Sequence, residues 1–361
     1  MTGIYLEPIG LLYGPVARDA IAFGGALPLA GGSIAFGAVR LWEGEPGNIK
    51  HAIVRTSTIQ AIEEQRVKEL LDRITAPRAS IAGVSMDGPR IMGIVNVTPD
   101  SFSDGGEHFE AGAAIAHAKA LASGGADFID IGGESTRPGA EPVTADEEFR
   151  RILPVLQGLT GLQTPISIDT RKPEVMREAA KVRADIINDV SALTYTSESA
   201  AAAAELKKPV ILMHAQGDPK TMQDNPTYRD VAVEVYDFLE SRIEAAVAAG
   251  LPRDSLIADP GIGFGKTTGH NRSLLQSISL FHGLGVPLLT GISRKRSLQK
   301  VAAGGDLKEQ HAPSVAAALD AVSQGVQIVR VHDLEPTRQA LAVWKWLRGG
   351  QAVAENPHSH L

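Results

Sequence analysis

The sequence predicts an α/β protein: a (β/α)8 TIM barrel that carries a small N-terminal α/β appendage. Three observations favour this fold. Short apolar runs recur eight times from residue 91 onward, segments with a helical pattern lie between them, and this repeat fills the chain to about residue 348. A (β/α)8 barrel typically takes about 250 residues, which agrees with that span. An open, doubly wound parallel sheet is the structural alternative.

The apolar runs have the character of buried strands. Each is short, rich in Ile and Val, and not strictly alternating between apolar and polar residues. This pattern is typical of parallel strands that are covered on both faces. The predicted strands span residues 91–97, 128–133, 165–169, 185–189, 209–214, 256–259, 287–293 and 327–331.

Helices are predicted between these strands. The segments 110–126, 228–251 and 312–326 have apolar residues at helical spacing, and glycines stand near their ends at Gly124–Gly125, Gly250 and Gly325. Glycine at that position is a helix stop signal, because it adopts the left-handed conformation without strain.

Residues 1–88 do not follow this rhythm, so we assign them to the appendage. Segment 24–47 indicates Gly-rich turns around one or two strands, and segment 57–74 predicts one helix. No function follows from this part of the sequence, and a packing or oligomerisation element is the simplest interpretation. Residues 89–348 form the predicted barrel, and we expect residues 349–361 to be a disordered tail.

The composition excludes several classes of function. The formal net charge is −7 and there is no long basic run, which argues against a nucleic-acid surface. The chain has no cysteine, so disulfide and thiolate chemistry are excluded. We find neither a secretion signal nor an apolar run of membrane-spanning length, and we therefore expect a cytoplasmic protein that binds no membrane.

A polar residue follows or ends every predicted strand. One such residue alone is more often structural, since Asp and Asn are common in turns. In a barrel, however, all the carboxyl ends converge on one mouth, where a set of polar groups needs a ligand or one another. In chain order these residues are Asn96, Asp130, Asp169, Asn188, His214, Asp259, Lys295, and Arg330 with His332.

The set divides by chemistry. Asp169, Asn188 and Asp259 provide carboxylates and an amide, which suit the donor and acceptor edge of a flat heterocycle. The polar groups of the first and eighth strands, which are neighbours in a closed barrel, suit an anion such as a diphosphate with Mg²⁺. Lys295 follows the seventh strand, a frequent anion-binding position in barrel enzymes.

The glycine-rich segment "DPGIGFGKT" (259–267) does not match the known nucleotide signatures. A P-loop needs Gly where Pro260 stands, and the dinucleotide G-x-G-x-x-G pattern needs Gly where Lys266 stands. The segment "GGEST" around Ser135 likewise lacks the G-x-S-x-G spacing of a nucleophile elbow.

Eight sequence blocks together closely resemble the dihydropteroate synthase family of folate biosynthesis. They occur in order between residues 91 and 346, and the N-terminal region of about 90 residues is extra relative to compact members. The blocks are "MGIVNVTPDSFSDGG", "ADFIDIGGESTRPGA", "SIDTRKPEV", "ADIINDVSAL", "LMHAQGDPKTMQDNP", "ADPGIGFGKT", "GISRKRS" and "VRVHD".

The resemblance implies a transferase reaction. The enzyme would join 6-hydroxymethyl-7,8-dihydropterin diphosphate to 4-aminobenzoate, giving 7,8-dihydropteroate and diphosphate. Mg²⁺ is the implied cofactor, and Asn96 would be its protein ligand. The implied partners are these small-molecule substrates and a second copy of the chain in a homodimer.

The resemblance also implies a role for each site residue. The implied catalytic residues are Asp169, Asp259, Lys295 and Arg330. The pterin would be bound by Asp169, Asn188, Met213, Asp259, Phe264 and Lys295. The diphosphate would be bound by Asn96, Arg137, Arg330 and His332.

The implied 4-aminobenzoate site draws on two mobile loops, which contain residues 98–106 and the "ESTRPG" segment. Its residues would be Phe102, Thr136, Pro138, Lys295 and Arg296, with Asp130 supporting the loops from its strand end. Arg296 departs from the family, in which Ser commonly follows the lysine. If the carboxylate is recognised by the backbone amides at the helix start after Lys295, this change matters little. If recognition uses the Ser hydroxyl, the guanidinium must replace it.

Alternatives remain for the function and for single residues. Pterin-binding methyltransferases and non-catalytic synthase paralogues would share the barrel and its pocket carboxylates. His214 fits a satisfied core histidine, and we expect Asp185 and Asp189 to bond the backbone. Arg294 suits an anion contact or a surface charge equally well.

Overall fold

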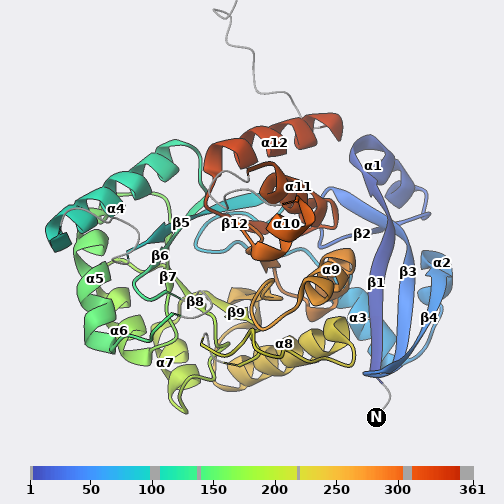
Figure 1. The fold of residues 1–361 in the computed structure, drawn as a ribbon. Helices are drawn as coiled ribbons and strands as arrows, with labels where there is room; N and C mark the ends of the chain where they lie inside the picture. Colours follow the sequence, from blue (N-terminus) through green and yellow to red (C-terminus); the bar gives the residue numbers. More distant parts are fainter. Residues whose placement is uncertain (1–2, 98–105, 136–139, 218–219, 304–310, 350–361) are drawn as a thin grey trace, which may run out of the picture.

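The computed structural model describes residues 3–97, 106–135, 140–217, 220–303 and 311–349 and confirms the predicted barrel. Eight parallel strands pair in the order β10-β9-β8-β7-β6-β5-β12-β11 and are surrounded by helices (Figure 1). The strands are β5 (Arg90–Asn96), β6 (Phe128–Gly132), β7 (Ile166–Asp169), β8 (Ile186–Asp189), β9 (Val210–Met213), β10 (Leu256–Asp259), β11 (Leu289–Thr290) and β12 (Ile328–Val331).

The sheet closes between β10 and the residues that lead into β11. Ala258 forms a parallel bridge with Leu288, and its N–H donates to the carbonyl oxygen of Pro287 at 2.9 Å. This closure excludes the open, doubly wound alternative. The seventh strand is shorter than the predicted 287–293, because the chain leaves the ladder after Thr290 and turns into the loop that carries Ser293.

Apolar side chains fill the barrel interior at the amino ends of the strands. Met92, Phe128, Ile186, Ile211, Ile257, Leu289 and Ile328 form one buried cluster there. Ile81 and Met86, which precede β5, belong to the same cluster. The segment before the first barrel strand therefore plugs the end of the barrel that lies away from the polar strand ends.

The outer layer contains the predicted helices. They are α4 (Gly106–Ser123), α5 (Ala145–Gly158), α6 (Pro173–Val182), α7 (Ser199–Leu206), α8 (Val231–Ala248), α9 (Thr268–Gln276), α10 (Arg296–Val301), α11 (His311–Ser323) and α12 (Leu334–Leu347). The three glycine stop signals are confirmed: Gly125, Gly250 and Gly325, each just beyond its helix, have φ values of 96°, 103° and 89°.

The appendage is an antiparallel sheet with three helices. Its elements are β1 (Gly3–Tyr13), α1 (Gly14–Ala22), β2 (Leu27–Pro28), β3 (Ile34–Glu45), β4 (Asn48–Arg55), α2 (Thr56–Ile59) and α3 (Gln65–Thr75). The one or two strands predicted in segment 24–47 are confirmed as β2 and β3, and β3 also pairs with β1 and β4, which lie outside that segment.

The prediction of one helix over residues 57–74 was wrong, because the chain breaks between α2 and α3. Ile59 is fully buried, whereas the positions four and seven residues later are Glu63 and Arg66. A continuous helix would place these charges on the stripe that Ile59 buries. The break lets Ile59 and the Val67–Leu70–Ile74 stripe of α3 pack separately.

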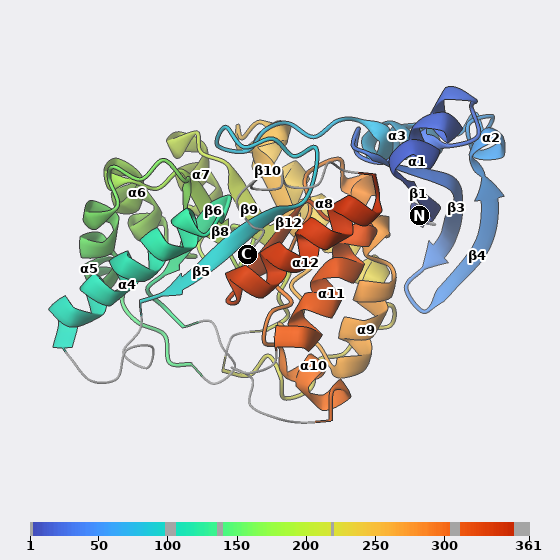
Figure 2. The ribbon, with the colours of Figure 1, turned by 90° about the horizontal axis from the view of Figure 1, so that it is seen from above.

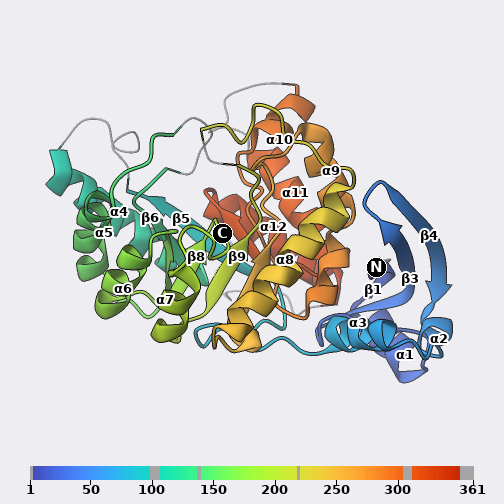
Figure 3. The same cartoon turned by 90° about the horizontal axis from the view of Figure 1, so that it is seen from below.

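The appendage lies beside the barrel on the side of α8 and α9, away from α4 to α6 (Figures 2 and 3). Tyr5, Leu70 and Ile74 share one hydrophobic core with Tyr236 of α8 and Phe281 of the 3₁₀ segment η3 (Ile278–Leu284). No helix in the described ranges is both long and apolar enough to cross a membrane.

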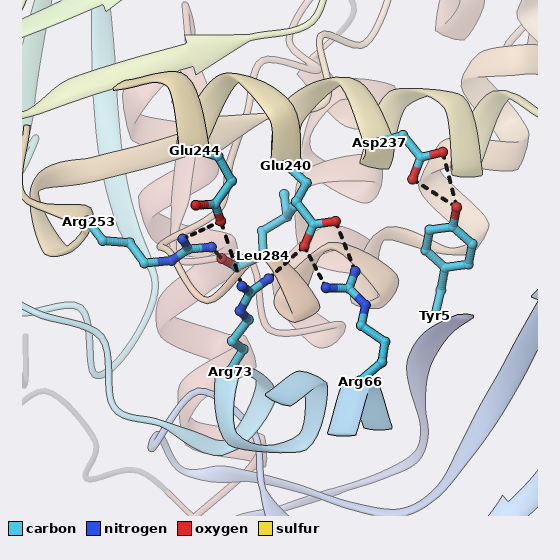
Figure 4. Close-up of polar contacts among 8 residues, drawn as sticks. All are labelled: Tyr5, Arg66, Arg73, Asp237, Glu240, Glu244, Arg253 and Leu284. Carbon is cyan, nitrogen blue, oxygen red and sulfur yellow. Dashed lines mark hydrogen bonds and ion pairs between the residues drawn. The ribbon is translucent and has the colours of Figure 1, made fainter. Parts of the chain in front are cut away.

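Polar contacts reinforce this packing along α8 (Figure 4). The Tyr5 hydroxyl donates to Asp237 at 2.8 Å, and its ring meets that of Tyr236 edge-on. Arg66 and Arg73 of α3 both donate to the carboxylate of Glu240, at 2.9 and 2.6 Å. The appendage is thus fixed to α8 through both apolar and ionic contacts.

Candidate active site

The buried carboxylates at the strand ends are bridged by one arginine. Arg330 on β12 donates from Nε to Asp130 Oδ2 at 2.6 Å and from Nη2 to Asp169 Oδ2 at 2.8 Å. Asn188 on β8 donates from Nδ2 to the same Asp130 oxygen at 3.1 Å. Four strands, β6, β7, β8 and β12, therefore place these side chains together inside the barrel, as the convergence argument predicts.

Two oxygens of this network have no hydrogen-bond partner among the described residues. They are Asp130 Oδ1 and Asp169 Oδ1, and both are buried. A buried acceptor without a donor is costly, and in a native protein it points to a bound water, ion or ligand. The network is therefore prepared to accept N–H groups from a molecule in the barrel mouth.

Burial also controls the charges of the site. Burial raises the pKa of Asp169, although the guanidinium of Arg330 opposes this rise. For Arg330 itself, burial lowers the pKa, but the carboxylates of Asp130 and Asp169 outweigh burial and hold it above its usual value. The arginine therefore stays charged, and its ion pair with Asp169 at 2.8 Å favours the ionised form of that carboxyl group.

Asp259 ends β10 directly opposite Met213 in the parallel ladder. Its Oδ1 accepts a hydrogen bond from the Gly261 N–H at 2.8 Å. Burial raises the pKa of Asp259 to about 6, and the Gly261 N–H and the charge of Lys295 oppose that rise. A carboxylate with this pKa is mostly ionised at neutral pH and can act as a charged acceptor.

A cavity of about 430 Å³ opens beside these strand ends, and Met213 and Phe264 are among its lining residues. The Lys295 Nζ lies 4.1 Å from the centre of the Phe264 ring, in a cation–π arrangement. A size of 300–1,000 Å³ is usual for small-molecule sites. Met213 and Phe264 thus give the cavity an apolar wall, and Arg171 is the charged residue in its lining.

Asn96 and His332 lie at the ends of neighbouring strands, β5 and β12. The His332 backbone N–H donates to Ser293 Oγ at 3.2 Å, and its ring Nδ1 lies 3.1 Å from the same oxygen. Lys295 is the N-cap of α10, so Arg296 is the first residue of that helix. The predicted helix start after Lys295 is confirmed.

The structure resolves the open single-residue readings. His214 is buried, and burial together with the nearby Lys266 charge lowers its pKa to about 2, which agrees with a core histidine. Asp185 accepts from the Ile166 N–H, and Asp189 accepts from the Leu193 N–H, as predicted. Arg294 forms an ion pair with Asp333 at 2.5 Å, a partner that neither reading of this residue named.

Two findings go beyond the sequence reasoning. Asp130, predicted to support loops, is joined to Arg330 by a short ion pair. Lys266 was weighed only as a mismatch to nucleotide motifs, yet it is a buried side chain that donates to the carbonyl oxygen of Phe264. Four predicted site residues lie outside the described part of the chain: Phe102, Thr136, Arg137 and Pro138.

The fold and the polar strand ends define a (β/α)8-barrel enzyme with a buried, charged site. The family described as pterin binding enzyme matches residues 92–332. The chain is 47% identical over 266 residues to the dihydropteroate synthase of Escherichia coli strain K12, which covers 72% of this chain and 93% of that protein. The chain belongs to the pterin binding enzyme family, as one of its dihydropteroate synthases.

Solved structures agree with this assignment. Dihydropteroate synthase of Xanthomonas albilineans with 4-aminobenzoic acid superposes with a TM-score of 0.71 at 48% identity, covering 76% of this chain and 99% of that one. The same enzyme in complex with 7,8-dihydropteroate has a TM-score of 0.69 at 45% identity, with 76% and 100% covered. Because these proteins are matched almost completely, the chain carries a region that they lack, as predicted for the N-terminal residues.

Proposed function

We propose that the barrel mouth joins 6-hydroxymethyl-7,8-dihydropterin diphosphate to 4-aminobenzoate and that residues 89–348 form the pterin-binding unit. The observation that carries this proposal is the pair of buried, open acceptors, Asp130 Oδ1 and Asp169 Oδ1, beside Asp259. A pterin presents several N–H groups along one edge, which is the complement such acceptors need. The Xanthomonas albilineans complexes with 4-aminobenzoic acid and 7,8-dihydropteroate support this choice of substrates.

In the proposed complex, Asp169, Asn188 and Asp259 bind the polar edge of the pterin. Met213 and Phe264 cover its ring, and Lys295, which lies against Phe264, closes the pocket on the same side. Burial strengthens each hydrogen bond, because water no longer competes for the same groups. This arrangement supports tight binding of a flat, polar heterocycle.

The chemistry breaks the bond between the pterin methylene carbon and the diphosphate oxygen. The aminobenzoate nitrogen then bonds to that carbon and releases a proton, while the bond electrons leave with the diphosphate. The carboxylates of Asp169 and Asp259 stabilise positive charge that develops on the pterin, since fixed charges in a buried site act strongly on the transition state. Within the described contacts, Arg330 uses Nε and Nη2 for the carboxylates, which leaves Nη1 for the diphosphate.

Mg²⁺ fits the proposed site as a cation held partly by the substrate. In the part of the chain that the structure describes, no group of three or more His, Cys, Asp or Glu could hold a metal. Mg²⁺ is commonly bound by one or two protein oxygens together with substrate phosphates and water. The Asn96 amide oxygen at the end of β5 would supply such a ligand, and the bound ion would neutralise charge on the departing diphosphate.

The remaining assignments stay predictions. His332 and Arg137 are proposed to contact the diphosphate, and Phe102, Thr136 and Pro138 the aminobenzoate, with its carboxylate at the backbone of Arg296. A cytoplasmic location and a homodimer are likewise retained as predictions.

The direct test mixes the purified protein with Mg²⁺, the pterin diphosphate and 4-aminobenzoate. We expect diphosphate and 7,8-dihydropteroate to appear in equal amounts, with no condensation product when 4-aminobenzoate is replaced by benzoate, which lacks the amine. Pterin binding without product would identify a non-catalytic paralogue. Methyl transfer from methyltetrahydrofolate to a corrinoid protein, without synthase activity, would favour the methyltransferase alternative.

A further inference from the structure

Lys266 is a buried lysine that the proposed chemistry does not use. It lies in the loop between β10 and α9, and only 3% of its surface is exposed. Its Nζ lies 2.9 Å from His214 Nδ1, 2.9 Å from the Gly261 carbonyl oxygen and 3.0 Å from that of Phe264. A fourth acceptor, the His214 carbonyl oxygen, lies at 3.3 Å.

All four hydrogen-bond partners described for this ammonium group are neutral. Burial lowers the pKa of Lys266 to about 7, with Asp259 opposing and Lys295 adding to the decrease. The His214 ring is neutral as well, so a charged Lys266 requires the ring Nδ1 to accept and the ring proton to reside on Nε2. A buried cation is costly unless its hydrogen bonds are satisfied, and here they tie one group to several backbone positions.

These contacts fix the loop that carries Phe264. Gly261, Gly263 and Gly265 all have positive φ, between 59° and 86°, and a Cβ at Gly261 would meet the His214 carbonyl oxygen at 1.9 Å. Side chains elsewhere hold the carbonyl groups of two of these glycines: Gln223 donates to Gly263 and Tyr228 to Gly265. Lys266 donates to the carbonyl oxygens of Gly261 and Phe264 in the same loop.

Lys266 also joins the ends of two strands that carry pocket residues. The His214 N–H, directly after β9, donates to the Asp259 carbonyl oxygen at 3.0 Å. The Gly261 N–H donates to the Asp259 side chain. His214 and Gly261 are thus the two residues whose N–H groups donate to Asp259. The ammonium group bonds to both of them and so restrains the surroundings of Asp259.

We propose that Lys266 is a positioning residue for the pterin pocket. Its ammonium group fixes the backbone of Gly261 and Phe264. It thereby holds the Phe264 ring, the Lys295 side chain and the Asp259 carboxylate in the geometry that binds the pterin. The inference rests on the proposed function, because it concerns the same pocket. Lys266 acts through its neighbours and does not itself contact the substrate.

The test compares Lys266→Met with the wild-type protein. The variant keeps the length of the side chain but removes the ammonium donors, and we expect the KM for the pterin diphosphate and the Kd measured by calorimetry to rise about tenfold or more. The KM for 4-aminobenzoate should rise much less, because Lys295 is the one residue implied for that site whose position depends on Lys266. A loss of stability alone would not raise the KM for one substrate more than the KM for the other.

Two further variants make the result decisive. Lys266→Gln keeps N–H donors for the loop carbonyls and should give an intermediate pterin KM, even if Lys266→Met does not fold. Val155→Ala removes buried methyl groups from α5 and should lower stability without changing the pterin KM. Unchanged pterin affinity in both lysine variants would overturn the inference. A wild-type protein that binds the pterin but forms no product would instead contradict the proposed function, and calorimetry would still test Lys266.

Discussion

At the scale of single residues, the site holds ionised groups where burial disfavours charge. Asp259 is buried, and its pKa rises from 3.8 to about 6. The folded protein therefore binds a proton at this residue more readily than the unfolded chain does between these two values. Stability falls as pH rises across this window, and above it the full penalty of the buried carboxylate remains.

Asp259→Asn should stabilise the unliganded protein while weakening pterin binding. The amide still accepts from the Gly261 N–H but carries no charge. One pKa unit corresponds to about 1.4 kcal/mol, so we expect a gain of about 1–3 kcal/mol at pH 8. Urea unfolding at several pH values measures this gain, which should vanish below about pH 4. Equal stability of both proteins at pH 8, or unchanged pterin affinity, would contradict the assignment.

At the scale of elements, the short barrel strands carry apolar packing at one end and the polar site residues at the other. Apart from β5 and β6, the barrel strands have four residues or fewer, so apolar packing at their amino ends and polar groups at their carboxyl ends lie close together. Among the outer helices, α8 connects the barrel to the appendage. Along α8, Glu240 accepts from both Arg66 and Arg73, and its side chain is only 20% exposed.

Glu240→Gln should lower stability without lowering kcat. Although burial acts to raise the pKa of Glu240, the two arginines outweigh it and lower the pKa below 4.5. The carboxylate therefore contributes stability above about pH 4.5, and that contribution is lost as pH falls through its lowered pKa. We expect a loss of about 1–2 kcal/mol at pH 7 by urea unfolding, which disappears at acidic pH.

A matched control is Glu335→Gln, because Glu335 pairs with Arg338 on the surface of α12. Exposed pairs of this kind contribute little, so the control should unfold like the wild type. The same loss in both variants would show that the ion pairs between α3 and α8 stabilise the protein no more than an exposed pair does.

At the scale of the whole molecule, the appendage and the barrel share one hydrophobic core. The cluster runs from Tyr5 and Leu6 through Leu70 and Ile74 to Phe281 and Leu284 of the barrel. The segment after α3 has a second role, since Ile81 belongs to the cluster that plugs the barrel. Residues before β5 therefore stabilise the barrel at two places, the face of α8 and η3 and the amino end of the barrel, and both lie away from the polar strand ends.

Two truncations should separate these roles. Removal of residues 1–77 uncovers the faces of α8 and η3, so we expect a lower Tm and a stronger tendency to aggregate, with kcat retained in the folded fraction. Removal of residues 1–85 also deletes Ile81 from the plug and should cost a further 2–5 kcal/mol or so, by analogy with large core truncations. Thermal unfolding and specific activity measure both effects. A folded 78–361 chain without activity would show that the appendage contributes to the site.

The sequence by itself determined the barrel, the order of its strands and most of the residues at its mouth. These follow from local signals: apolar runs of strand length, glycines that need a positive φ, and polar residues where each run ends. Because every parallel strand ends at the same mouth, a list of strand ends such as Asp169, Asn188 and Asp259 is already a list of neighbours.

Only the tertiary structure decided which of these groups pair and which remain open. The bridge from Arg330 to Asp130 and Asp169 joins residues up to 200 positions apart, and no local pattern encodes it. The same holds for the anchoring of the appendage to α8 and for Lys266, whose role depends on acceptors in the segments that follow β9 and β10. Periodicity reports which residues are buried, whereas hydrogen-bond partners depend on distances that arise only when the barrel closes.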